Sequence, residues 1–293
     1  MTLRMPVPPK RAALALAVTA ATAVAALALP SGTRADPLSV FQPKTVRTVS
    51  VRPVDLLALR ALPPLDEFGT VRTEGSVGAD QPLSAAVASR DAGYALRLPA
   101  TLPPSLPNEP RYHVTRRSRS SFTFSKTKAA AWARQHNVPL HPLPAGLDGT
   151  TYTVTLQPIT AVTYGTAPWA RDEQHRTATA SFLGLVQSPL PQIASTGAPL
   201  RALTGWFAAQ PGISKRLAAQ IQALGDPAQT LPIPIRFNEQ TASKIAVDGV
   251  EGLAIGDETG IGSVVVWTKD GRFYAIAGSL PQSDLLALAN DLK

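Results

Sequence analysis

The stretch SVVVWTKDGRFYAIA, residues 263–277, decides the fold class of this chain. Two runs rich in β-branched and aromatic residues, at positions 263–268 and 272–277, enclose Asp270-Gly271. An Asp-Gly pair between two such runs is typical of a tight hairpin turn, because both residues tolerate the left-handed backbone conformation that the turn requires. The stretch therefore predicts two antiparallel strands joined by a hairpin.

The sequence on both sides of this hairpin extends the pattern. Residues 245–247 and 250–255 predict two more strands before it. Residues 281–292 predict a helix after it, with Leu285 and Leu288 on one apolar face. A helix that follows a run of strands and covers them is typical of an α+β fold. We therefore expect an α+β fold of antiparallel sheets with covering helices.

Shorter patterns fill the preceding part of the chain. Apolar residues alternate with threonines in residues 151–157, which predicts a half-buried strand. Ser125 is placed to cap a helix over residues 126–136. Similar patterns predict strands at 112–116, 121–124, 161–165 and 182–187, helices at 199–209 and after Ser214, and an extended edge segment at 231–235.

Four regions are expected along the chain. Prolines are frequent in its first part, and proline favours extended structure because it lacks a backbone donor and restrains its neighbour. The expected regions are a signal peptide or membrane anchor at 1–35, an extended Pro-rich tether at 36–110, a first α/β unit at 111–190, and a C-terminal α+β unit at 199–293 that could form one domain with the first unit.

The N-terminus has the pattern of an export signal. Arg4, Lys10 and Arg11 precede an uncharged, apolar run from Ala12 to Leu29. A basic start followed by an apolar run directs a chain out of the cytoplasm. Cleavage before Asp36 and retention of the run as a membrane anchor both stay open. In either case we expect the body of the protein to be extracytoplasmic, either secreted or membrane-anchored.

Composition narrows the chemistry. The chain of 293 residues has no cysteine, which excludes disulfides, cysteine-based zinc sites and thiol catalysis. Four of the 28 basic residues lie in the first 35 positions, so the net charge of +8 falls to +4 for the remainder. The remaining excess of basic over acidic residues is concentrated before residue 144.

Local motifs do not indicate an enzyme. The sequence contains neither a HExxH zinc motif nor a GxSxG nucleophile elbow. Glycines 256, 260 and 262 lie between two expected strands, where no helix N-terminus is available for a phosphate. The spacing of the acidic residues near these glycines matches no calcium loop. We therefore predict no catalytic, cofactor-binding or metal-binding residues and no cofactor. The groups considered were His113, His136, His141 and His175, and Asp248, Glu251, Asp257, Glu258 and Asp270.

A basic segment surrounds Phe122, Phe124 and Trp132. It could be a solvated hairpin whose phenylalanines face the core, a surface for anionic envelope material, or a nucleic-acid surface. Because the protein is expected outside the cytoplasm, we expect no nucleic acid, and an anionic envelope component or an envelope protein is the expected partner. The candidate anion-contacting residues are Arg111, Arg116, Arg117, Arg119, Lys126 and Lys128.

The C-terminal part resembles a known bacterial domain. The segments VDGVEGL at 247–253, VVVW at 264–267, DGRFYAIAG at 270–278 and LLALA at 285–289 carry the resemblance. They resemble the C-terminal extracytoplasmic domain of unknown function found in transmembrane anti-sigma factors and their exported relatives. The resemblance implies an α+β domain that binds or senses in the envelope, and it implies no catalytic residues.

One departure from that family affects the expected function. Those anti-sigma factors carry a cytoplasmic sigma-binding domain, often with a His/Cys zinc motif. Few residues precede Ala12 in this sequence, and cysteine is absent. We therefore expect that the chain does not sequester a sigma factor by that route.

The sequence favours a non-enzymatic, extracytoplasmic binding or sensing protein associated with the envelope, with a connection to sigma-factor regulation left open. Two alternatives remain. One is an exported hydrolase with a dispersed site, which converging Ser, His and Asp side chains would indicate. The other is a protein that resembles a lipid or lipoprotein carrier, which a cavity lined by aliphatic side chains would indicate.

Overall fold

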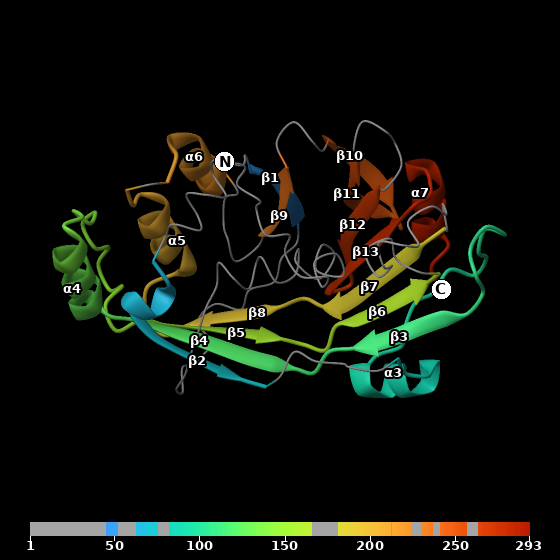
Figure 1. Ribbon diagram of the computed structural model, residues 1–293, viewed down its shortest axis with the longest axis horizontal. Helices are drawn as coiled ribbons and strands as arrows, with labels where there is room; N and C mark the ends of the chain where they lie inside the picture. Colours follow the sequence, from blue (N-terminus) through green and yellow to red (C-terminus); the bar gives the residue numbers. More distant parts are fainter. Residues whose placement is uncertain are drawn as a thin grey trace, which may run out of the picture.

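The computed structural model describes residues 45–51, 63–75, 82–165, 181–211, 213–223, 230–236, 241–256 and 263–293. Within these ranges the protein has the expected α+β architecture: one seven-stranded and one four-stranded antiparallel sheet, with helices against them (Figure 1). The expected signal or anchor at residues 1–35 lies outside the described residues. None of the helices in the described ranges has the length and hydrophobicity of a membrane span.

The elements follow one another in this order. The strands are β1 (Thr45–Val51), β2 (Gly69–Glu74), β3 (Pro110–Val114), β4 (Ser118–Phe124), β5 (Thr151–Leu156), β6 (Thr160–Tyr164), β7 (Leu183–Pro189), β8 (Gln192–Ser195), β9 (Thr230–Arg236), β10 (Thr241–Val247), β11 (Val250–Gly256), β12 (Val264–Lys269) and β13 (Arg272–Gly278). The helices are the 3-10 turn η1 (Leu65–Glu67) and α3 (Ala85–Ala92), α4 (Lys126–His136), α5 (Leu200–Ala208), α6 (Lys215–Ala223) and α7 (Gln282–Asn290).

The hairpin predicted around Asp270-Gly271 forms, with β12 paired antiparallel to β13. The strands expected before it also form, and β10 pairs antiparallel with β11. Asp270 and Gly271 take positive φ values of 49° and 71°, the left-handed conformation that the tight turn needs. Asp248 and Gly249 make the corresponding turn between β10 and β11, with φ values of 51° and 77°. The helix predicted at 126–136 is also confirmed, with the Ser125 hydroxyl accepting from the Lys128 amide.

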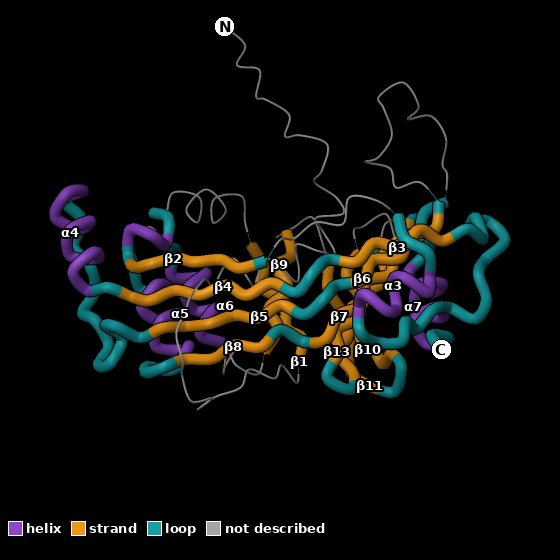
Figure 2. Tube along the Cα trace, turned by 90° about the horizontal axis from the view of Figure 1, so that it is seen from below, coloured by secondary structure: helices purple, strands orange, loops and turns teal. Residues whose placement is uncertain are grey.

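Three long strands run through both sheets. β3 continues into β4, β5 into β6 and β7 into β8, and Figure 2 shows them side by side along the molecule. The register is unbroken, because Val114 pairs with Thr160 and Ser118 with Leu156. The register is also unbroken between the second and third long strands, where β6 pairs with β7 and β5 pairs with β8. The two sheets are therefore joined by one three-stranded ribbon.

The ribbon buries opposite sides in its two halves. Tyr112 and Val162 belong to the core that includes α3 and α7, whereas Phe122 and Tyr152 belong to the core that includes α5. All four are even-numbered and would share one side of a flat ribbon. Figure 1 shows α3 and α5 on opposite sides of the ribbon, near its two ends, so the strands twist between the halves. Each half thus has its own core.

In the seven-stranded sheet, Trp267 and Tyr274 face α3 and α7, and their rings stack 5.2 Å apart. The opposite face, with Val266 and Phe273, is covered in part by Ile233 of β9. β9 pairs with β1 in a separate parallel pair. Val49 of this pair packs with Leu217 of α6, and the Arg47 guanidinium donates to the Ala223 carbonyl at 3.1 Å.

The described part of the region expected as an extended tether, 36–110, includes regular structure. It contains β1, η1, β2 and α3, the last capped by Ser84 and ended by Gly93 in the left-handed conformation. The prolines of residues 99–110 do limit regular structure, but they do not prevent packing: Leu106 is buried, and Leu98 exchanges two backbone hydrogen bonds with Lys293.

The regions expected at 111–190 and 199–293 do not correspond to the two sheets. Leu203 and Trp206 of α5 pack with the four-stranded sheet, whereas β10–β13 complete the seven-stranded one. Strands that follow one another along the chain, such as β3 and β4, belong to different sheets.

Candidate functional site

An open groove of about 840 Å³ lies between α4 and the segment that follows it, at one end of the molecule (Figure 1). Lys126, Ala130 and Arg134 line it from α4. Leu140 lines it from the following segment, and Trp206 of α5 lines it from the body of the protein. Its size is within the range of small-molecule sites, roughly 300–1,000 Å³.

The local sequence explains why a groove forms here. The face of α4 toward it carries alanines, whose small side chains leave space beside the helix. The helix ends at Asn137, whose backbone has a left-handed φ of 53°. The backbone N–H of Asn137 donates to the carbonyls of Ala133 and Arg134. The following segment contains Pro139 and Pro142, which keep it extended. An Ala-rich helix thus faces an extended Pro-rich segment.

An aromatic cluster supports the groove from below. The Trp206 ring contacts the rings of Phe124 and Phe68 edge to face, at centroid distances of 5.1 Å and 5.7 Å. The Trp206 indole N–H donates to the His141 carbonyl at 3.1 Å, which ties the segment after α4 to α5. Phe68 also packs at 5.4 Å from Trp132, on another side of α4. The two walls of the groove are therefore attached to one core.

The groove has a positive charge. Its lining includes Lys126 and Arg134, and none of the described residues that line it is an aspartate or glutamate. Asp148 lies near the first turn of α4, where its carboxylate accepts from the Lys126 amide at 2.8 Å. The groove can therefore offer an apolar surface and cationic groups to the same ligand.

The structure does not bring the six candidate anion-contacting residues together. Lys126 alone among them lines the groove. The Lys128 ammonium donates to the carbonyls of Gly69 and Asp66, at 2.7 Å and 3.1 Å, and so attaches α4 to η1 and β2. The other four are exposed on β3, on β4 and on the segment between these strands: Arg111, Arg116, Arg117 and Arg119.

The histidines are also dispersed. His113 is on β3. Burial is the main cause that lowers its pKa, and the positive charge of the neighbouring Arg111 lowers it further. The His136 ring stacks on Trp132 at 4.6 Å, while His141 lines the groove. His175 lies outside the described residues. The described part of the chain contains no cluster of three or more histidines or carboxylates that could hold a metal ion.

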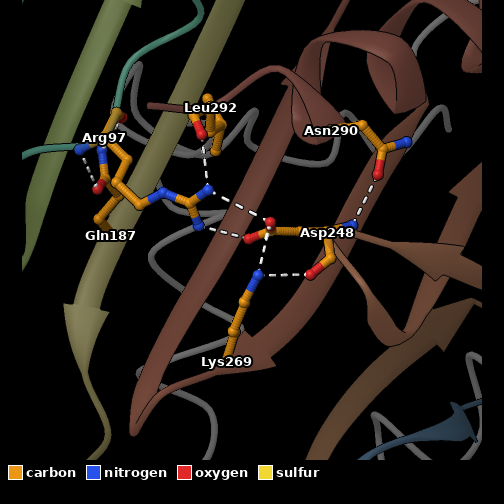
Figure 3. A network of polar contacts seen from close by, with 6 residues as sticks. All are labelled: Arg97, Gln187, Asp248, Lys269, Asn290 and Leu292. Carbon is orange, nitrogen blue, oxygen red and sulfur yellow. Dashed lines mark hydrogen bonds and ion pairs between the residues drawn. The ribbon is translucent and has the colours of Figure 1, made fainter.

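A second polar cluster lies at the other end of the molecule, around Asp248 (Figure 3). The Asp248 carboxylate forms an ion pair with Arg97. It also accepts from the Lys269 ammonium at 2.8 Å, and the same ammonium donates to the Asp248 carbonyl at 2.7 Å. The Asp248 amide donates to the Asn290 side chain at 2.7 Å, and Arg97 donates to the Leu292 carbonyl at 2.6 Å.

This Asp248 cluster holds three parts of the chain together. The backbone of Arg97 exchanges hydrogen bonds with the Gln187 amide group, at 2.9 Å and 2.6 Å. Burial opposes ionisation of Asp248, but its hydrogen bonds with Arg97 and Lys269 outweigh burial and lower its pKa. Since both cations are already paired with this carboxylate, the cluster has a structural role.

The other acidic residues considered for a metal site are separate from Asp248. Glu251 pairs with Lys244 at 2.9 Å on the surface, and Asp270 is exposed in its turn. Asp257 and Glu258 lie outside the described residues.

Sequence reasoning missed most of the groove. Trp206, Leu140 and Leu143 come from two segments separated by the ribbon, and no local spacing connects them. One signal was present: the run VPLHPLP at 138–144 follows directly after an Ala-rich helix. An extended apolar segment beside small helical side chains is a way to make a groove.

Comparison with protein-family models, characterised proteins and solved structures found no match to this chain. The residues of the groove are therefore the basis on which a function is assigned.

Proposed function

We propose that this protein is a non-enzymatic, extracytoplasmic binding protein that holds an anionic component of the cell envelope in the groove beside α4. One observation carries the proposal: Lys126 and Arg134 flank an apolar groove whose described lining contains no carboxylate. A site of one charge sign attracts ligands of the opposite sign and raises their local concentration. The aliphatic lining favours, among the alternatives, a protein that carries or senses an amphiphile.

The two cations are suitably arranged for an anion. Lys126 and Arg134 are eight residues apart on α4, and therefore about 12 Å apart along the helix axis. Lys126 stands in the first turn, where the Asp148 carboxylate already accepts from its backbone amide, so the Lys126 side chain and not the helix end is offered to an anion. Because both side chains are exposed, their attraction for an anion is screened over about 8 Å at physiological salt. Binding that depends on them should weaken as salt rises.

The extracytoplasmic location has separate support. The basic start and the apolar run from Ala12 to Leu29 favour export. The resemblance of residues 247–289 to the extracytoplasmic domain of anti-sigma factors favours a role in envelope sensing. That resemblance is the one argument for a connection to sigma-factor regulation, which is also part of the proposal.

Calorimetric titration with a soluble anionic lipid tests the proposal. Dihexanoyl phosphatidylglycerol should bind the full chain more tightly than dihexanoyl phosphatidylcholine, and raised salt should remove most of the difference. The double variant Lys126→Gln, Arg134→Gln should lose at least tenfold in affinity. The matched double variant Arg116→Gln, Arg117→Gln removes two exposed cations outside the groove and should bind like the parent. Equal losses in both variants, or no preference for the anionic lipid, would contradict the proposal.

A further inference from the structure

The lining of the groove is mainly apolar, and an anionic head group alone would not use it. Ala129, Ala130 and Ala133 come from α4, Leu140 and Leu143 come from the facing segment, and Trp206 comes from α5. Removal of apolar surface from water is the main favourable term when a small ligand enters such a site. The lining therefore favours a ligand that has an apolar part of its own.

The shape of the groove indicates what that part is. The lining residues of α4 include Lys126, Ala130, Ala133 and Asn137, a spacing of three and four that follows one face of the helix over its length. A helix of 11 residues is about 16 Å long. A groove that follows one helix face from end to end suits an extended acyl chain better than a compact ring or a head group.

The charges lie at the two ends of this face. Lys126 stands in the first turn of α4, and Arg134 stands in the last turn. Both Lys126 and Arg134 are exposed, so an anionic head group beside either one stays in water. The alanines lie between them. The arrangement fits a molecule with a charged end and one apolar chain.

We infer that the ligand is a single-chain anionic amphiphile, such as a fatty acid or a monoacyl phospholipid, whose chain lies along α4 between Lys126 and Arg134. This inference rests on the proposed binding function and names the ligand class of the same site. A polyanion without a chain, or an acidic peptide, would use the cations without depending on chain length.

A chain-length series separates these ligands. The full chain is titrated with octanoate, decanoate and dodecanoate, each below its micelle concentration, and with dodecylphosphocholine, which has a dodecyl chain and a zwitterionic head. Each methylene that becomes fully buried strengthens binding roughly fourfold, and each step of the series adds two, so the affinity should rise by up to about sixteenfold at each step. Dodecylphosphocholine should bind several-fold more weakly than dodecanoate.

The apolar run from Ala12 to Leu29 could bind alkyl chains by itself, so the Lys126→Gln, Arg134→Gln variant, which leaves it unchanged, serves as the control. In that variant the affinity for dodecanoate should fall toward that for dodecylphosphocholine. An affinity independent of chain length would overturn the inference and leave the proposed function standing. Dodecylphosphocholine bound as tightly as dodecanoate would overturn both. If no carboxylate in the series binds, the inference fails, and the titration with dihexanoyl phosphatidylglycerol decides the proposed function separately.

Discussion

Arg97 and Asp248 are 151 residues apart in sequence and form an ion pair that joins the segment after α3 to the turn between β10 and β11. The Asp248 side chain is only 9% exposed, and Lys269 pairs with it from β12. Through the Leu292 carbonyl, Arg97 also contacts the end of the chain. One carboxylate thus connects the Pro-rich segment, two neighbouring hairpins and the region after α7.

Replacement of Asp248 by asparagine should destabilise the seven-stranded sheet. An asparagine at this position would keep the left-handed turn but would leave Arg97 and Lys269 without their anion, and hydrogen bonds to charged groups contribute about 1.5–3 kcal/mol each. We expect the free energy of unfolding, measured with urea, to fall by about 1.5–3 kcal/mol. Asp270→Asn is the matched control, since Asp270 takes the same position in an exposed turn, and it should change stability by less than about 0.5 kcal/mol.

The contribution of Asp248 should also depend on pH. Its pKa is lower in the folded protein than in the unfolded chain, where it is about 3.9. A lowered pKa gives stability that is present above the unfolded value and is lost as the pH falls through the folded value. The difference between the parent and Asp248→Asn should therefore be constant near neutral pH and shrink below about pH 4. A difference that stays constant into strong acid would contradict the ion pair.

The parts of the fold that the sequence predicts well are those with local causes. The turn at Asp270-Gly271 and the helix capped by Ser125 depend on a few neighbouring residues, and both are confirmed. The ribbon depends on pairings between residues far apart in sequence, such as Ser118 with Leu156. It also depends on a strand twist that no residue pattern predicts. The isolated pair of β1 and β9 likewise needed two distant segments to be considered together.

The candidate site was accessible to sequence reasoning only in part. Lys126 was among the predicted anion contacts because it belongs to a visible cluster of basic residues. Lys128 belongs to the same cluster but points toward the carbonyls of Asp66 and Gly69, and composition alone does not distinguish the two. Trp206 lies on a helix whose apolar face is equally consistent with an ordinary core. Its place in the groove follows from tertiary packing.

Trp267 should be essential for the stability of the seven-stranded sheet. The side chain is fully buried and stacks on Tyr274. Trp267→Ala should lower the free energy of unfolding by about 3–5 kcal/mol, because it removes a large buried aromatic side chain. Trp267→Phe keeps an aromatic ring and removes an indole N–H that has no partner in the described structure, so it should cost less. Equal stability of the alanine variant and the parent in thermal unfolding would refute this packing.

Lys128 should stabilise α4 without contacting the ligand. Ala129 is the one buried residue of this helix, so the two hydrogen bonds from Lys128 add to an attachment otherwise made by Ala129 and the contact of Trp132 with Phe68. Lys128→Met keeps the aliphatic stem and removes both bonds. Hydrogen exchange of the α4 amides should accelerate, and ligand affinity should fall less than in Lys126→Gln. Unchanged exchange in α4 would mean that the Lys128 contacts do not hold the helix.

The N-terminal run should determine the location of the protein. A reporter enzyme that is active only outside the cytoplasm, fused to the C-terminus, should be active in the full chain. Deletion of the residues from Ala12 to Leu29 should abolish its activity while the fusion is still made, because the export signal is lost. Reporter activity that persists after the deletion, or a full-length fusion found soluble in the cytoplasm, would be inconsistent with export through this run.

The central claim is that the groove beside α4 is the binding site, and a matched pair of tryptophan substitutions tests it most directly. Both Ala130 and Ala131 are exposed on α4, but Ala130 lines the groove and Ala131 is not among the lining residues. Ala130→Trp fills the groove and should reduce the affinity for dihexanoyl phosphatidylglycerol at least tenfold in calorimetric titration. Ala131→Trp adds the same bulk and should bind like the parent, with both variants unfolding at the same temperature. Equal affinities of the two variants would contradict the claim.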